Sequence, residues 1–403
     1  MKKFIEITTK SLTAFLLVVA AAFIASNISP IFSFEPPEPF SGPDIFNPYS
    51  GMDWDTGWKR ANFHTHTRVN GIFNECEEWP DTVWNDYMKL GYDILSFSNH
   101  NELTEHPFDP ALQIDVYEHG YNVFQYHKLV FGPKDGVNLF DNLTPFLTSQ
   151  RQWQLDLLGR DADFIILNHP DRTRVTRSRM MELLTGYRIM EGDSGVSTDF
   201  IHWDEALSAG HYSFGITNDD CHDSRNSSRI AVRCSFLNSP SATYGDIRET
   251  LLSGRYYSMR VPDYGNGDWE EKYRRNRSLP AVTGIGARQD TVFIRISAPA
   301  SSIQAIGQGH AILGHSEDSD VLEYVMKPED SYVRFTAFFD DGAVIYSNAF
   351  ARYDKAETDS PYRENPHPVN IPLTILFNLF IFLLTAGCII AITRLFTHKE
   401  KKS

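Results

Sequence analysis

The chain has few cysteines and a deficit of positive charge, and each scarcity excludes a class of protein. Its 403 residues include four cysteines and no CxxC pair, so the chain carries no disulfide framework. Lys and Arg total 37 against 52 Asp and Glu, which gives a formal net charge of -15. This charge argues against nucleic acid as a scaffold partner, although a small anionic substrate remains compatible with locally concentrated positive charge. No internal repeat or low-complexity tract stands out.

Long hydrophobic runs are present at both ends of the chain. Residues 11–33 are nearly uncharged and residues 371–393 carry no charge, and a bilayer span needs roughly 20 apolar residues. The second run predicts a transmembrane helix; the first predicts an anchor helix, with a cleaved signal peptide as the alternative. Lysines flank both runs on their outer sides, which predicts cytoplasmic ends at residues 1–10 and 394–403 and an extracytoplasmic body.

The segments between the two hydrophobic runs differ in composition. Proline-rich residues 34–57 and polar, proline-containing residues 354–370 read as linkers to the membrane. In residues 58–262, amphipathic helical segments alternate with short buried strands, which predicts a parallel sheet of the (β/α) barrel type. Residues 263–353 hold β-branched and aromatic runs separated by Gly, Asp, Ser and Pro, which predicts a small antiparallel β-sandwich.

Polar side chains follow several of the predicted strands at the point where each ends. His64 and His66 follow "WKRANF", His100 follows "YDILSFS", and His169 follows "DFIILN". Asp220 and His222 come soon after "HYSFGIT". A barrel would gather these groups at one rim, and imidazole with carboxylate suits Zn, Fe or Mn. The pattern therefore predicts a metal site, with solvated loop histidines as the alternative interpretation.

The order of these motifs resembles a known family. The sequence reads HTHT, NHN, YEHG, HKLVFG, NHP and DDCH over about residues 58–260, followed by "GDIRETLLSGRYYSM". This order resembles the PHP family, named for polymerase and histidinol phosphatase. The resemblance implies a distorted, TIM-like (β/α)7 barrel with two or three divalent metal ions (Zn, Mn or Fe) at its rim that hydrolyse phosphate esters.

The resemblance also implies roles for particular residues. The expected metal ligands are His64, His66, His100, Glu118, His127, His169, Asp220 and His222. His64 and His66 would share one metal with Glu118 and Asp220, and Glu118 would bridge to a second metal held by His127 and His169. His100 and His222 would hold a third. Glu118, Asp220 and His222 are the residues expected to act in catalysis.

Two positions depart from the family pattern. Asn70 stands where an acidic residue or histidine usually follows HxHT, and Asn99 stands where Asp usually precedes the second-motif histidine. A neutral amide is a poor ligand for these metals, so the third site loses a charged member. Glu75 or Glu77 could replace it, or the centre could be dinuclear.

Two arginines are expected to bind substrate. Arg172 lies just beyond His169, and Arg225 just beyond His222. In an acidic protein, arginines beside metal motifs suit a phosphate group, because the planar guanidinium pairs with two oxygens. The alternative is a solvated basic face.

The sequence therefore predicts a membrane-anchored, extracytoplasmic phosphoesterase that uses a metal-activated water. Its substrate would be a phosphorylated small molecule or cell-surface group. A metal-dependent amidohydrolase or deacetylase is one alternative, because that class also places HxH on a (β/α) barrel. A catalytically degenerate binding ectodomain is the other alternative, and Asn70 and Asn99 favour it.

Overall fold

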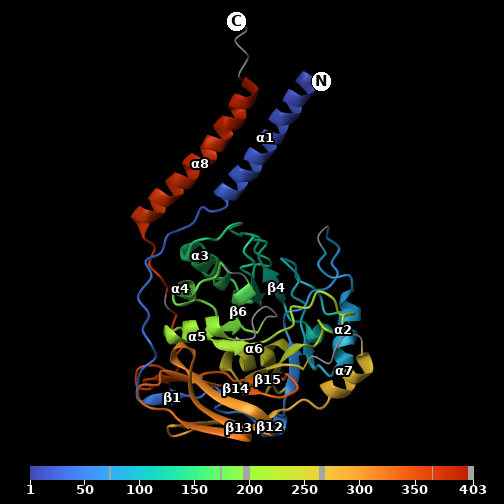
Figure 1. Ribbon diagram of the computed structural model, residues 1–403, viewed down its shortest axis with the longest axis vertical. Coiled ribbons are helices and arrows are strands. Elements are labelled where there is room, and N and C mark those ends of the chain that lie inside the picture. The colour runs from blue at the N-terminus through green and yellow to red at the C-terminus, as the bar shows by residue number, and fades with distance from the viewer. Residues whose placement is uncertain (72–73, 173–174, 194–199, 263–267, 365, 398–403) are drawn as a thin grey trace.

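The computed structural model has a compact body with two long helices that project from one end (Figure 1). The structure describes residues 1–403 except 72–73, 173–174, 194–199, 263–267, 365 and 398–403. The predicted basic tail therefore lies outside the described residues from position 398 onward.

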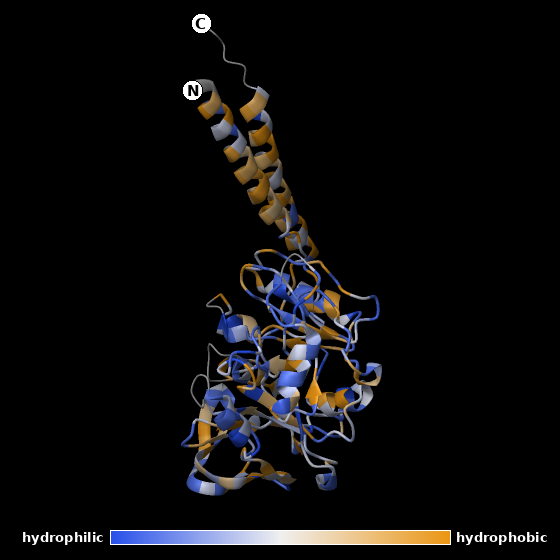
Figure 2. Ribbon diagram, turned by 90° about the vertical axis from the view of Figure 1, so that its right-hand side faces the viewer, coloured by the Kyte–Doolittle hydropathy of each residue, from blue (hydrophilic) through white to orange (hydrophobic). Residues whose placement is uncertain are grey.

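The two projecting helices are α1 (Lys2–Ala25) and α8 (Ile371–Thr397). They contact each other and run antiparallel, so that the first turn of α1 and the last turn of α8 lie on the side away from the body (Figure 1). Both are apolar along most of their length (Figure 2). The segments Phe4–Ala25 and Ile371–Thr397 are long and apolar enough to cross a membrane.

Helix α1 ends earlier than the predicted run at residues 11–33. The backbone N–H of Ser29 donates to Asn378 Oδ1 of α8, and that of Ile31 donates to Thr374 Oγ1. Phe32 forms an isolated antiparallel bridge with Val369. The residues after Ala25 therefore leave the helix because α8 and the body satisfy their backbone groups.

Within the described residues, the strands of the body form two sheets, and one of them has eleven strands. Eight follow one another in the order β1 (Asp44–Phe46), β16 (Phe350–Tyr353), β14 (Tyr332–Phe338), β15 (Val344–Tyr346), β10 (Tyr256–Arg260), β9 (Arg233–Leu237), β2 (Lys59–Asn62) and β3 (Ile94–Leu95). The remaining three strands branch from β14 and are β12 (Thr291–Gly307), β11 (Val282–Arg288) and β13 (Ala311–Val325).

The second sheet has five strands in sequence order. They are β4 (Val116–His119), β5 (Lys128–Phe131), β6 (Phe164–Leu167), β7 (Ile189–Glu191) and β8 (Phe214–Ile216). The helices of the body are α2 (Pro80–Lys89), α3 (Thr148–Gly159), α4 (Ser178–Met181), α5 (Ile201–Ser208), α6 (Tyr244–Ser253) and α7 (Trp269–Asn276).

The predicted (β/α)7 barrel is wrong. Among the described residues the strands form two sheets and not one closed parallel barrel, and isolated bridges at Thr65–Cys221 and His100–Glu118 are the contacts of strand type between them. In the five-stranded sheet, β5 runs antiparallel to both β4 and β6. The loop between β4 and β5 holds no helix, so this connection returns the chain in the opposite direction.

The predicted separate β-sandwich is also wrong. Strand β15 pairs with β14 on one side and with β10 on the other, so the C-terminal strands continue the sheet that contains β9 and β2. Strands β12 and β13 form a long hairpin at the end of the body opposite the terminal helices (Figure 1). Alternating β-branched residues identified strands here, but they could not specify the partner of each strand.

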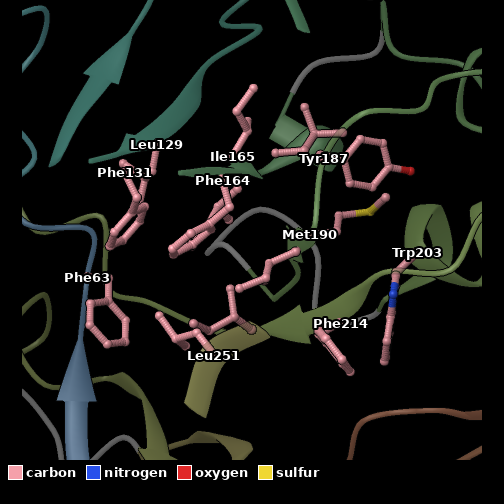
Figure 3. Packing of buried hydrophobic residues seen from close by; sticks show 14 of the residues in the cluster. Phe63, Leu129, Phe131, Phe164, Ile165, Tyr187, Met190, Trp203, Phe214 and Leu251 are labelled. Carbon is pink, nitrogen blue, oxygen red and sulfur yellow. The ribbon is translucent and has the colours of Figure 1, made fainter. Parts of the chain in front are cut away.

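A large apolar core holds the two sheets together (Figure 3). Phe131 and Phe164 are paired across β5 and β6 with their rings stacked 4.5 Å apart. Phe63, which follows β2 in the other sheet, packs on Phe131 at 5.9 Å. Because all three rings are buried, this core fixes the ends of β2, β5 and β6 relative to one another.

Candidate metal centre

The side chains with metal-ligating groups meet where the two sheets adjoin. Backbone contacts set this meeting point: the N–H of His66 donates to the carbonyl of Cys221 at 2.9 Å, and that of Asn101 donates to the carbonyl of Glu118 at 2.8 Å. The first contact joins the exit of β2 to the exit of β8, and the second joins the exit of β3 to β4. Residues far apart in sequence therefore share one small volume.

Four of the expected ligands form one group. His64, His66, Glu118 and Asp220 are buried, and one ligand atom from each lies within 4.8 Å of the others. His64 Nε2 is 3.1 Å from Glu118 Oε2 and 3.1 Å from Asp220 Oδ1. His66 Nε2 is 3.2 Å from the same two oxygens. Two imidazoles and two carboxylates can therefore surround one divalent cation.

Glu118 faces histidines on both of its carboxylate oxygens. Oε1 lies 3.1 Å from His127 Nδ1 and 3.2 Å from His169 Nε2, while Oε2 also faces His100 Nε2 at 3.1 Å. His100, Glu118 and His127 form a second group of possible ligands. A carboxylate placed in this way can serve two cations at once, because each oxygen has a different set of imidazoles beside it.

The close approach of His127 depends on a glycine. Gly120, which ends the YEHG motif, has φ 122°, and a Cβ built there would lie 3.1 Å from His127 Cδ2. A side chain at this position would meet both backbone strain and the imidazole. The glycine thus lets His127 pack against the end of the strand that carries Glu118.

A third group contains an acidic residue from the loop after HxHT. Glu75 Oε2 lies 3.2 Å from His100 Nε2, 3.7 Å from His66 Nδ1 and 3.8 Å from His222 Nδ1. The rings of His66 and His222 are stacked at 4.1 Å. Asn70, the uncertain third-site position, is exposed, so the nearby carboxylate comes from Glu75, five residues further along the chain.

The Asn99 side chain makes hydrogen bonds that hold a loop in place. Its Oδ1 accepts from the backbone N–H of Thr67 at 2.8 Å, and its Nδ2 donates to Thr67 Oγ1 and Thr104 Oγ1. The amide therefore fixes the loop that follows His64 and His66, a role that needs both a donor and an acceptor. An aspartate at this position would supply no donor.

The sequence analysis missed Glu191, the last residue of β7. This buried carboxylate lies 3.1 Å from His64 Nδ1 and accepts from the backbone N–H of His169 at 3.1 Å and from Asn218 Nδ2 at 3.0 Å. A carboxylate on the second nitrogen of an imidazole fixes the ring orientation and leaves Nε2 for the metal. The signal was available, because Glu191 ends a buried strand as the other polar residues do.

Several buried imidazole nitrogens have carboxylates nearby but no hydrogen bond. Within the described part of the chain, His64 Nε2, His66 Nε2 and His127 Nδ1 have no hydrogen-bond partner. Buried polar atoms are almost always paired, so unpaired nitrogens that converge on Glu118 indicate a missing partner. Metal cations at the two groups would accept these lone pairs, from His64 and His66 at one position and from His127 at the other, and the donor set therefore fits divalent metal binding.

The charge balance of the site shifts several pKa values. Burial alone would lower the pKa of His64, but the carboxylates of Glu118, Asp220 and Glu191 raise it well above its usual value. For His66, burial likewise acts to lower the pKa, but Asp220 and Glu118 raise it to about 9. Burial would raise the pKa of Glu118 and Asp220, but the surrounding histidines hold both well below the usual range. In the metal-free chain, protons therefore supply the positive charge that the carboxylates need.

Other imidazoles in the cluster behave differently. Burial lowers the pKa of His100 to about 4, and it also lowers the pKa of His127. Both rings are therefore neutral at pH 7 and need no deprotonation before they ligate a metal.

Two proposed ligands have unusual backbone conformations. His169 has φ 25° and Asp220 has φ 50°, both in the region that favours glycine. Such conformations cost about 1–3 kcal/mol each and persist where the surrounding structure imposes them. The fold thus uses backbone strain to turn these two side chains toward Glu118.

The two expected substrate-binding arginines lie in different places. Arg172 Nη1 is 2.5 Å from Asp220 Oδ2 and 3.4 Å from His169 Nε2, so its guanidinium borders the cluster. Arg225 is more exposed and its Nη1 lies 3.4 Å from Asp86 Oδ1. A cavity of about 30 Å³ opens beside the cluster, lined by His66, Thr67, Val69, Glu75, Asn99, His100 and Tyr121.

Comparisons with known proteins add one distant likeness. No protein-family model matches the chain, and no curated protein matches it. A crystal structure of a two-domain protein from Bacteroides vulgatus ATCC 8482, described as containing a predicted PHP-like metal-dependent phosphoesterase, aligns with 78% of this chain and 100% of its own. The identity is 14% and the TM-score 0.36, values at which the likeness carries no argument about this chain.

Proposed function

We propose that this chain is a membrane-anchored, metal-dependent phosphoesterase of the PHP type. The observation that carries the proposal is Glu118, a buried carboxylate with imidazoles beside both oxygens. The motif order HTHT, NHN, YEHG, NHP and DDCH supports the same assignment. A bridging carboxylate among histidines suits hydrolysis of a phosphate ester, because two adjacent cations can hold both the attacking and the leaving oxygen.

The proposal assigns ligands by the groups described above. His64, His66, Glu118 and Asp220 would hold one metal, and Glu118 with His127 and His169 or His100 a second. Glu75, His66 and His222 offer a third position. Bound Zn, Mn or Fe ions would supply Lewis-acid chemistry, polarising the phosphate and lowering the pKa of a water.

The protein side chains would position the phosphate and control its charge. Arg172, which borders Asp220, could pair two guanidinium N–H groups with phosphate oxygens. Arg225 would need to leave Asp86 to make the same contact, and its exposed side chain is long enough to turn. Glu191 would keep His64 in one orientation throughout the reaction.

The proposed enzyme would be anchored in a membrane by its two terminal helices. Helices α1 and α8 would both cross the bilayer, with the termini in the cytoplasm and the body outside it. The substrate would then be a phosphorylated small molecule or cell-surface group that reaches the body from the extracytoplasmic side.

A feature next to His127 bears on the amidohydrolase alternative. Amidohydrolases often use a lysine that bridges the metals, and Lys128 is the residue adjacent to His127 in sequence. Its Nζ donates to the carbonyl of Tyr126 at 2.9 Å and to Gln154 Oε1 at 2.5 Å. The amino group is therefore engaged by two neutral oxygens, which favours a bridging glutamate and phosphoester chemistry.

Metal analysis and turnover of the full chain test this proposal. We expect two or more divalent ions per chain and hydrolysis of p-nitrophenyl phosphate or bis-p-nitrophenyl phosphate. The chain should not hydrolyse an acetylated amide, and the His64→Ala/His66→Ala variant should not hydrolyse either phosphate ester. His315→Ala is the matched control, because His315 is exposed on β13. A metal-free chain, or amide turnover in place of phosphate turnover, would refute the proposal.

A further inference from the structure

A loop of the body presents apolar side chains to the outside. We call residues 137–147 the apical loop, and its exposed apolar residues are Leu139, Phe140, Phe146 and Leu147, at 73%, 39%, 61% and 39% exposure. Val123, at 55% exposure, lies beside them, since its N–H donates to the carbonyl of Leu143. Exposed apolar groups gathered in this way mark an interaction surface.

The apical loop lacks exposed charge. In its sequence, VNLFDNLTPFL, Asp141 is the one ionisable residue. The Asp141 carboxylate accepts from the N–H of Tyr121 at 2.8 Å and from Gln154 Nε2 at 2.8 Å. Because these contacts turn the charge inward, the outer face of the loop is apolar and aromatic, the composition typical of segments at a membrane interface.

The loop is fastened to the body-proximal end of α1. Asn142 Nδ2 donates to the carbonyl of Ser26 at 2.6 Å, and Asn27 Nδ2 donates to Thr144 Oγ1 at 2.7 Å. Gln150, just after the loop, donates to the carbonyl of Asn27. These contacts begin one residue after α1 ends at Ala25, at the end of the body from which both terminal helices project (Figure 1).

The length of α1 indicates where the apical loop lies relative to the bilayer. The apolar segment of α1 has 22 residues, which at 1.5 Å per residue spans about 33 Å, close to the thickness of a bilayer core of about 30 Å. A bilayer crossed by this segment ends near Ala25. The apical loop, hydrogen-bonded to Ser26 and Asn27, would then lie at the level of the lipid head groups.

The inner side of the loop touches the metal centre. Tyr121 links the two: its N–H donates to Asp141, its hydroxyl donates to the carbonyl of His100 at 3.2 Å, and its ring lies 5.3 Å from the His100 ring. His119 Nε2 donates to the carbonyl of Phe140 at 2.8 Å. One layer of side chains therefore separates the outer face of the loop from His100 and Glu118.

We infer that the apical loop rests in the head-group layer of the bilayer that α1 and α8 enter, and that the substrate is the phosphorylated head group of a lipid in that membrane. This inference rests on the proposed phosphoesterase function. The same phosphate monoester chemistry exists in soluble molecules. The contacts of the loop with Tyr121 and His119, which border the cluster, favour the lipid source, because they hold the cluster close to the membrane surface on which the loop would rest.

The membrane contact can be measured without any turnover. The full chain with Cys388→Ser keeps Cys76, Cys221 and Cys234 buried, so a cysteine placed at an exposed position takes a fluorophore selectively. In phosphatidylcholine vesicles, brominated lipids should quench a label at Leu139→Cys several-fold more than a label at Ile312→Cys. Ile312 is also exposed but lies on β13, at the far end of the body. Equal quenching at both positions would overturn the inference.

The lipid source is tested with two substrates. For the metal-loaded chain in vesicles containing phosphatidate, Leu139→Ser/Phe146→Ser should lower the rate about ten-fold while leaving hydrolysis of glycerol phosphate in solution unchanged. A rate on glycerol phosphate that exceeds the rate on phosphatidate, or an equal fall on both substrates, would overturn the inference. Failure of the proposed function differs from both outcomes, since it would abolish turnover of every phosphate ester and leave the quenching difference in place.

Discussion

Two of the buried clusters of charged side chains in the body differ in the source of positive charge. At one, Asp204 of α5 accepts from Arg334 Nε at 2.8 Å and Nη2 at 2.6 Å, from Tyr332 at 3.0 Å and from His310. Asp204 and Arg334 are both buried, and a bidentate pair of this kind satisfies the carboxylate completely. The protein itself neutralises this charge.

The metal centre has the opposite balance. Glu118, Asp220 and Glu191 are buried among imidazoles, and within the described residues the guanidinium of Arg172, which is 27% exposed, lies against Asp220. Imidazoles supply positive charge only while they hold protons, whereas Arg334 always holds its charge. A buried acidic cluster whose positive charge comes mostly from titratable imidazoles and from one partly exposed arginine is suited to an external cation, whereas a cluster that holds a buried arginine is suited to stabilising the fold.

The largest effect should follow from breaking the centre at its shared carboxylate. Glu118→Gln removes the charge between the proposed metal positions, so we expect bound metal to be lost. Phosphate ester turnover should fall by roughly 10³-fold or more, the scale seen when a preorganised charge-stabilising group is removed. Metal analysis and steady-state kinetics check this. A variant that kept its metal and its rate would show that the cluster is not a metal centre.

The corresponding change in the other cluster should affect stability. Asp204→Asn leaves Arg334 buried without a counter-charge, so the free energy of unfolding should fall by about 3–5 kcal/mol. Burial would raise the pKa of Asp204, but Arg334 lowers it, so this stabilisation is present above about pH 4 and is lost as the pH falls. Urea unfolding with and without added metal measures the effect. A loss that disappeared when metal was added would contradict the distinction between the two clusters.

A smaller effect on metal affinity is expected from changing Glu191, which contacts the proposed ligand His64. Glu191→Gln keeps the shape of the side chain but weakens its hold on His64 Nδ1. Metal affinity should fall by about 10–100-fold, the usual cost of losing such a partner. Competition with a chelator measures the affinity. Glu249→Gln, on the exposed surface of α6, is the matched control and should leave the affinity unchanged.

The smallest effect is the pH dependence of metal affinity, which tests whether protons supply the positive charge of the metal-free centre. The pKa of His66 is raised from 6.5 to about 9 in the folded, metal-free chain, so its proton stabilises that state below about pH 6.5 and the contribution is lost as pH rises through about 9. Metal must displace this proton, so affinity should rise by up to about tenfold per pH unit between pH 7 and 9. Calorimetry in two buffers with different ionisation enthalpies would detect the released proton. An affinity independent of pH over this range would contradict the prediction.

Local patterns in the sequence were enough to propose the candidate ligands and to locate the two terminal helices. Short apolar runs followed within a few residues by His64, His66, His169 and Asp220 placed these groups near strand ends, because a buried strand ends where polar residues begin. Long uncharged runs likewise marked α1 and α8, since length and hydrophobicity are local properties.

The pairing of the strands and the partners of the charged groups became visible in the folded chain alone. The sequence predicted a closed parallel barrel, but β5 runs antiparallel to its neighbours, because hydrophobic periodicity does not encode strand direction. It did not predict that Glu191 would lie against His64, or that Arg334 would reach Asp204 across 130 residues. Such contacts depend on the packing of distant segments, which local residue patterns do not specify.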